Sequence, residues 1–297
     1  MTQPDRPSSF TGDRARDRFL ATYDRTLHRL WPVPVEAADV QTSSGTVRVY
    51  RAGPPEGDPV VLLSGAGGNA LSWYRHVGAL AAQRRVLAVD PLGEPGRSTA
   101  TRALAAPDVG GWLLEVLAAL DVRRAHLVGS SFGGWTALQA QRQDQRDGGA
   151  RIAALTLVDP AGLAPLDRRF YRWVVLGGMA ALLPAPVRRR AAGRLRNGTL
   201  REDDLLRLGL AGRGFRRRLP TPPVATDAEL AAVAVPTGLL LGADSALHDS
   251  AAVAQRVARV APGWQVEVVP CTGHALPLEA VELVVARVLG EPAPDPV

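Results

Sequence analysis

The 297-residue chain is predicted to fold as an α/β domain with a mostly parallel, doubly wound sheet of about eight strands and a helical cap insertion. Short apolar runs alternate with helical patterns along most of the chain, which favours a parallel sheet covered by helices on both faces. The alternation stops between about residues 161 and 226, where helical patterns follow one another without a buried strand. Two strand-like runs near the N-terminus, joined by a turn, indicate an antiparallel edge.

The N-terminal segment, residues 1–34, is expected to contain a tail and one helix. Residues 1–12 are rich in Pro, Ser and Asp, so we predict that they are disordered. Apolar side chains then recur at helical spacing from Asp13 to Trp31, which predicts a helix there. Pro32 ends it, because proline cannot donate the next hydrogen bond.

The core, residues 35–160 and 227–290, is expected to hold the alternating strands and helices. Its strands are short, apolar and bounded by turn residues, as buried strands usually are. We predict strands at Val35–Thr42, Thr46–Arg51, Pro59–Ser64, Arg85–Val89, Ala125–Val128, Ile152–Val158, Pro236–Leu241 and Trp264–Val269. The predicted core helices are at about Leu71–Ala82, Asp108–Leu120, Trp135–Gln145, Ser250–Val260 and Pro277–Leu289.

Residues 161–226 are expected to form a helical cap over the carboxyl edge of the sheet. We predict helices at Phe170–Leu183, Val187–Leu195 and Arg201–Leu210, interrupted by prolines. The stretch is rich in arginine, and we interpret its arginine clusters as solvated helix faces. The Pro-rich tail, residues 291–297, is expected to be loose.

Composition favours a soluble globular protein. The 35 basic and 29 acidic residues give a net charge of +6, but no basic stripe interleaved with aromatic side chains is present, so we expect no nucleic-acid partner. No apolar run reaches the roughly 20 residues of a membrane-spanning helix. The polar N-terminus has no signal-peptide core, and the single cysteine, Cys271, fits a reducing compartment. We therefore expect a cytoplasmic protein, with a homodimer left open.

Cofactors and metals are not expected either. The sequence has no Cys/His cluster with the spacing of a zinc site. It also has no glycine fingerprint of the kind that binds a dinucleotide. The chemistry is therefore expected to depend on the protein's own side chains.

The most informative motif is Gly129-Ser130-Ser131-Phe132-Gly133, which lies between a buried strand and a helix. Gly-x-Ser-x-Gly in that context predicts a nucleophile elbow. A tight turn must hold the central serine so that its hydroxyl stands clear of the sheet. The flanking glycines leave room for neighbouring backbone. Ser131 is central and is therefore the candidate nucleophile, whereas Ser130 is not.

A serine hydroxyl needs a base within hydrogen-bond reach and a carboxylate that orients this base. In a doubly wound sheet, such groups gather beyond the carboxyl ends of the strands. His274 follows the last predicted strand, and Asp244 follows the strand before it. The order Ser131, Asp244, His274 is the order expected on this type of scaffold.

With these motifs, the chain resembles the α/β-hydrolase superfamily over about residues 35–290. The resemblance rests on the elbow, the segment Asp90–Ser98, the glycine-rich loop after Pro59–Ser64 and the pair Gly273-His274. It implies the α/β-hydrolase fold with a helical cap and a carboxylesterase-like serine hydrolase. Epoxide hydrolases and haloalkane dehalogenases of the superfamily are not expected, because they have a carboxylate where this chain has Ser131.

The resemblance implies an acid a few residues after the glycine that follows strand Pro236–Leu241. Asp244 is the closest match and is our choice, although it lies one residue nearer to this glycine than is usual. Asp159 follows the preceding strand, where some members of the superfamily have their acid, and is the main alternative. Asp249 directly precedes a helix, so we interpret it as an N-cap.

The oxyanion hole is expected to combine the backbone N–H groups of Phe132 and Ala66. The superfamily commonly has His-Gly at the start of the second loop, whereas this chain has Ser64-Gly65. A backbone donor does not depend on the side chain at its position, so we expect the hole to be present. The hydrogen bonds that brace the loop are expected to differ.

We predict a serine hydrolase that cleaves a small or medium-sized apolar ester or thioester through an acyl-enzyme. The alternative is a biosynthetic enzyme of the same fold, a lyase, cyclase or C–C bond hydrolase, which the Ser64 loop and the cap would suit. A non-catalytic binding protein is the third reading. The complete Ser/Asp/His set argues against it.

Overall fold

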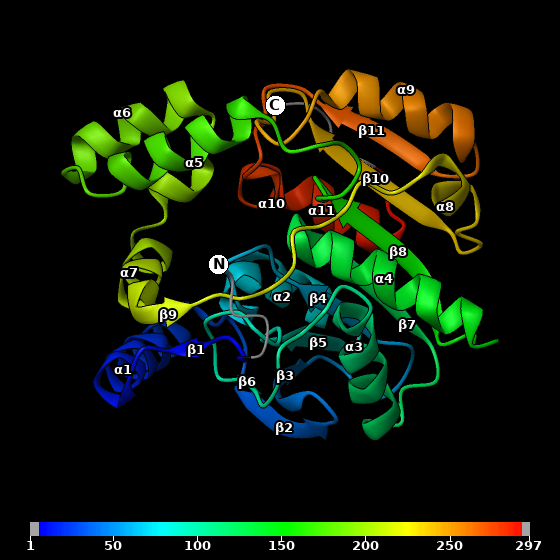
Figure 1. Ribbon diagram of the computed structural model, residues 1–297, viewed down its shortest axis with the longest axis horizontal. Helices are drawn as coiled ribbons and strands as arrows, with labels where there is room; N and C mark the ends of the chain where they lie inside the picture. The colour runs from blue at the N-terminus through cyan, green and yellow to red at the C-terminus, as the bar shows by residue number, and fades with distance from the viewer. Residues whose placement is uncertain (1–5, 293–297) are drawn as a thin grey trace.

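A nine-stranded sheet lies at the centre of the computed structural model, which describes residues 6–292 (Figure 1). Its order is β11-β10-β8-β7-β4-β5-β3-β2, with β6 paired to β3 outside this path. The strands are β2 (Glu36–Thr42), β3 (Gly45–Ala52), β4 (Val60–Leu63), β5 (Val86–Val89), β6 (Thr99–Ala100), β7 (Ala125–Ser130), β8 (Ile152–Val158), β10 (Thr237–Gly242) and β11 (Gln265–Val269).

The predicted parallel sheet with an antiparallel edge is confirmed. Strands β4, β5, β7, β8, β10 and β11 pair in parallel, whereas β2, β3 and β6 pair antiparallel. The carboxyl ends of these six parallel strands therefore lie at the same edge of the sheet. Catalytic groups gather at this edge in doubly wound sheets. The short strand β6 was not predicted.

Two hydrophobic clusters cover the two faces of the sheet, because successive side chains of a buried strand point in opposite directions. In β4, Val61 and Leu63 belong to one cluster, and Val60 and Leu62 to the other. The first cluster includes side chains of α3 (Asp108–Ala119), α4 (Phe132–Arg146), α8 (Asp227–Ala231) and α9 (Ser250–Val260). The second includes side chains of α1 (Asp13–Leu30), α2 (Tyr74–Ala81) and α11 (Val281–Leu289).

Two predicted helices are shorter than expected. The stretch predicted as Leu71–Ala82 begins with a 3-10 turn, Ala70–Trp73, before α2. The stretch predicted as one helix over Pro277–Leu289 is divided into α10 (Leu276–Glu279) and α11, because the backbone of Ala280 leaves the helical region (φ −134°, ψ 56°). None of the helices in residues 6–292 is long and apolar enough to cross a membrane.

Residues 161–226, predicted to form a cap, contain the helices α5 (Arg168–Ala180), α6 (Ala185–Leu195) and α7 (Asp203–Ala211). Figure 1 shows these helices together at one side of the sheet. After α7 the chain forms a two-residue strand, β9 (Phe215–Arg216), and returns to the core. The segment predicted to form a cap therefore follows β8 and precedes β10 in the chain.

The prediction that residues 1–12 are disordered is wrong for Ser9–Phe10, which form strand β1 and pair antiparallel with β9. Phe10 packs at 5.1 Å from Phe19 and at 5.0 Å from Phe215, measured between ring centroids. These aromatic contacts give the segment a fixed position that its polar composition did not indicate. Residues 1–5 and most of the predicted tail, 293–297, lie outside the described residues.

The close contact between α3 and α4, the helix that follows Ser131, can be tested by substitution at Gly110. A Cβ atom at Gly110 would lie 2.5 Å from the backbone nitrogen of Ala140, so Gly110→Ala must push the two helices apart. We expect this variant to lose ~1–3 kcal/mol of unfolding free energy in urea titrations.

Gly111→Ala is the matched control, because a Cβ atom there meets only the flexible end of Gln143, at 3.3 Å. It should be neutral or slightly stabilising, since alanine favours a helix over glycine by up to ~1 kcal/mol. Equal stability of the two variants would contradict the tight helix crossing.

Candidate active site

Ser131 lies at the sharp turn between β7 and α4, in a strained conformation with φ 51° and ψ −118°. Non-glycine residues rarely adopt a positive φ, and such strain is typical of functional turns. The turn needs glycine on both sides. A Cβ atom at Gly129 would lie 2.3 Å from the carbonyl oxygen of Gly133, and one at Gly133 would lie 2.3 Å from that of Leu63. The geometry is that of a nucleophile elbow.

His274 lies in the loop after β11 and connects two other side chains. Its Nε2 atom is 3.0 Å from Oγ of Ser131, and its Nδ1 atom is 2.6 Å from Oδ2 of Asp159. The rings of Phe170 and Trp173, both from α5, stand edge-on to the imidazole with centroids 6.2 Å and 5.6 Å away. The structure therefore brings Ser131 and His274 together as predicted, with cap residues beside them.

Asp159 directly follows β8 and is fully buried. Its Oδ2 atom also accepts a hydrogen bond from Oγ of Ser245 at 2.6 Å, and Oδ1 accepts one from the N–H of Gly242 at 3.1 Å. Burial raises the pKa of Asp159, but the hydrogen bond and charge of His274, with the charge of His248, lower it by more. The net shift is downward, so the carboxyl is ionised at neutral pH.

The prediction that Asp244 orients His274 is wrong. Asp244 is exposed and pairs instead with Arg196 of the cap, with 3.2 Å between Oδ2 and Nε. In the turn after β10, the side chain of Ser245 points toward the buried site, while that of Asp244 points outward. The acid at His274 is Asp159, the alternative from the preceding strand.

Asp249 has the role of N-cap that its sequence position indicated. Its side chain accepts a hydrogen bond from the backbone N–H of Ala252 at 3.0 Å, at the start of α9. This contact satisfies one of the free donors in the first turn of the helix. Asp249 is therefore accounted for without a part in the site.

The glycine-rich loop after β4 passes directly beside Ser131. A Cβ atom at Gly65 would lie 3.1 Å from Cβ of Ser131, and the loop turns where the N–H of Gly68 donates to the carbonyl of Gly65 at 3.0 Å. Within residues 6–292, neither the N–H of Phe132 nor that of Ala66 donates a hydrogen bond. Both predicted oxyanion donors are thus unpaired.

The other histidines do not compete with His274. Burial lowers the pKa of His76 to about 4 and that of His126 to about 4, so both are neutral at pH 7. His28 is exposed on α1. His248, in the loop after β10, is buried with Nε2 at 3.5 Å from Oδ1 of Asp159.

Sequence reasoning missed Ser245, His248 and Glu94 as neighbours of the site.

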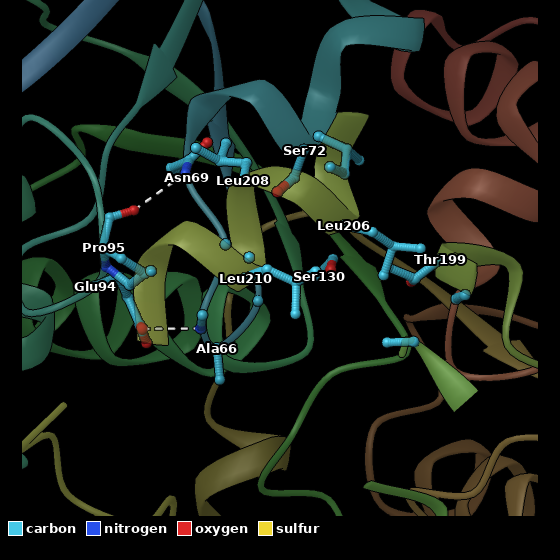
Figure 2. Close-up of a pocket in the computed structure, with 18 of the residues that line it drawn as sticks. Ala66, Asn69, Ser72, Glu94, Pro95, Ser130, Thr199, Leu206, Leu208 and Leu210 are labelled. Carbon is cyan, nitrogen blue, oxygen red and sulfur yellow. Dashed lines mark hydrogen bonds between the residues drawn. The ribbon is translucent and has the colours of Figure 1, made fainter. Parts of the chain in front are cut away.

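A cavity of about 500 Å³ opens beside His274 and Ser130, between the glycine-rich loop and the cap. Figure 2 shows its labelled walls, with Glu94 pointing toward the loop at Ala66 and leucines of α7 on another side. The described residues hold no cluster of His, Cys, Asp and Glu side chains suited to a metal ion.

Comparisons with known proteins identify the family of the chain. Residues 60–287 match the model of the alpha/beta hydrolase family. The carboxylesterase YbfK of Bacillus subtilis is 28% identical over 290 residues, which cover 92% of each chain. The crystal structure of naproxen esterase from Bacillus subtilis superposes with a TM-score of 0.80 at 26% identity and covers 94% of this chain and 98% of its own. The chain is a hydrolase enzyme and belongs to the alpha/beta hydrolase family.

Proposed function

We propose that this enzyme is a carboxylesterase that cleaves small or medium-sized apolar esters or thioesters through an acyl-enzyme. The observation that supports this most directly is the continuous hydrogen-bond chain from Ser131 through His274 to Asp159. A serine in such a chain is activated for attack on a carbonyl carbon. Two relatives from Bacillus subtilis, each matched over more than 90% of its own length, are named carboxylesterases.

In the proposed mechanism, Oγ of Ser131 attacks the carbonyl carbon while Nε2 of His274 takes its proton. Asp159 accepts the Nδ1–H of His274, which fixes the tautomer with a free Nε2 and stabilises the imidazolium that forms. The backbone N–H groups of Phe132 and Ala66 donate to the oxyanion. His274 then gives the proton to the leaving alcohol or thiol, and a water molecule releases the acid by the same steps in reverse.

The substrate class follows from the cavity walls. Leu205, Leu206, Leu208 and Leu210 of α7 face a space of about 500 Å³. This volume suits a ligand of modest size, and apolar walls favour an apolar substituent on the ester. The biosynthetic alternative has less support, because the two relatives matched over more than 90% of their own length are named carboxylesterases. A binding protein would not need the hydrogen-bonded set. A cytoplasmic location and a homodimer stay predictions.

Replacement of the nucleophile gives the first test. Ser131→Ala should abolish labelling by a fluorophosphonate and lower the kcat for p-nitrophenyl butyrate by roughly 10⁴- to 10⁶-fold, because the acyl-enzyme cannot form. Ser130→Ala is the neighbouring control and should still be labelled. Labelling that survives in Ser131→Ala but not in Ser130→Ala would overturn the assignment of the nucleophile.

Replacement of the two competing acids gives the second test. Asp159→Asn should lower kcat for the same ester by roughly 10³- to 10⁴-fold, because the amide no longer holds the productive tautomer of His274. Asp244→Asn, which removes only an exposed ion pair, should stay within about threefold of the wild type. Circular dichroism checks that both variants are folded. The reverse ranking of the two variants would restore Asp244 as the acid.

A further inference from the structure

The carboxylate of Glu94 lies beside the predicted oxyanion loop and has no exposed surface on its side chain. Its Oε2 atom accepts a hydrogen bond from the backbone N–H of Gly67 at 2.8 Å, one residue after Ala66. Figure 2 shows this contact as a dashed line next to the label of Ala66. Nearby, Nδ2 of Asn69 donates to the carbonyl of Pro95 at 3.1 Å. The Glu94 segment therefore holds the loop at two points.

The cation that pairs with this buried carboxylate comes from the cap. Nε of Arg217, one residue after β9, donates to Oε1 of Glu94 at 2.7 Å. Burial raises the pKa of Glu94, and the charge and hydrogen bond of Arg217 act in the opposite direction. Removal of one partner from a buried ion pair is costly, since the remaining charge has no compensation. Glu94 therefore depends on Arg217.

Arg217 also contacts the other side of the predicted oxyanion hole. Its guanidinium carbon lies 4.5 Å from the centroid of the Phe132 ring, within the range of a cation–π contact. Phe132 provides one of the two predicted oxyanion donors, and the loop held by Glu94 provides the other. Arg217 thus contacts Phe132 directly and reaches the loop through Glu94.

The N-terminal segment fixes the backbone around Arg217. Ser9 pairs with Arg216 in the small sheet of β1 and β9, and Oγ of Ser8 accepts a hydrogen bond from the N–H of Arg218 at 2.8 Å. The N–H of Thr11 donates to the carbonyl of Gly214 at 2.8 Å. These contacts hold the chain on both sides of Arg217 and so fix the position of its backbone.

Ser64, which begins the glycine-rich loop, does not brace it through a side-chain hydrogen bond within the part of the chain that the structure describes. Ser64 replaces the common histidine, and its buried Oγ has no hydrogen-bond partner among residues 6–292. The hydrogen bond from Gly67 to Glu94 is therefore the side-chain brace of the loop at this point.

We propose that Glu94 and Arg217 are positioning residues that hold the Ala66 N–H in the geometry needed for the oxyanion. The inference rests on the proposed function. A donor helps only if it points at the place where the charge develops, and loss of one donor costs about 10²- to 10³-fold in kcat. Glu94 and Arg217 act through that donor, so their loss should cost less.

The test uses p-nitrophenyl butyrate as substrate and an alkyl trifluoromethyl ketone as inhibitor. This ketone forms a hemiketal with the serine, and its oxyanion occupies the hole. Glu94→Ala and Arg217→Met should each lower kcat by about 10- to 100-fold, with KM changed less than about threefold. The Kd of the trifluoromethyl ketone should rise by the same factor as kcat falls, because both depend on the oxyanion contacts.

Arg142→Met is the matched control. Arg142 is buried to a similar degree as Arg217 and also pairs with a glutamate, Glu229, but it does not line the cavity. Its replacement should lower thermal stability by less, because the Glu229 side chain is one-third exposed whereas that of Glu94 is buried. It should leave kcat and inhibitor affinity unchanged. Glu94→Gln keeps an oxygen that can accept from Gly67, so it should restore part of the activity lost in Glu94→Ala.

Two results would overturn the proposal. One is a kcat and a trifluoromethyl ketone Kd within about threefold of the wild type in folded Glu94→Gln, Glu94→Ala and Arg217→Met. The other is a fall in kcat that leaves the affinity for the trifluoromethyl ketone unchanged. Either result leaves the proposed function intact, provided that Ser131→Ala is inactive. If Ser131→Ala is itself active, the proposed function fails instead.

Discussion

The hydrogen bond between the Asp159 carboxylate and the His274 imidazole is the contact on which the rest of the site depends. A fully buried carboxylate is stable only with several donors around it, and Asp159 has three, from His274, Ser245 and Gly242. These donors come from the ends of two neighbouring strands, β10 and β11, while Asp159 itself follows β8. The order of strands in the sheet therefore decides which carboxylate the histidine can reach, and Asp244, which is exposed on the other side of the same turn, is out of reach.

The proposed reaction also requires an oxyanion loop with a defined shape. Such a loop contains glycines that allow close approach to the serine, as Gly65 does, but glycine also adds conformational freedom. In this chain the neighbouring segment Asp90–Ser98 limits that freedom through Glu94, and the cap is connected to the same point through Arg217. The cap thus provides apolar cavity walls and, at its return to the core, a charged contact with the loop.

The sequence was most informative where a function needs a local pattern. Ser131 and His274 could be predicted because an elbow requires glycines at fixed spacing and because the histidine follows the last strand. The acid was not predictable in this way, since the direction of a side chain in the turn after β10 depends on how that turn packs against Asp159. Strand β1 was missed for a similar reason, because Ser9–Phe10 are ordered by Phe215, more than two hundred residues away. Glu94 has no pattern of its own, and only the folded loop shows its partners.

The strand order also has a consequence for how the protein folds. Ser131 and Asp159 are separated from His274 by 143 and 115 residues. Strand β11, which precedes His274, is an edge strand of the sheet within residues 6–292 and pairs with β10. Contacts between residues so far apart in the chain close large loops and form slowly. The three side chains therefore meet only after the chain has been made as far as His274 and β11 has joined the sheet. Under the proposed function, esterase activity during refolding therefore reports the joining of β11 to the sheet rather than the collapse of the core.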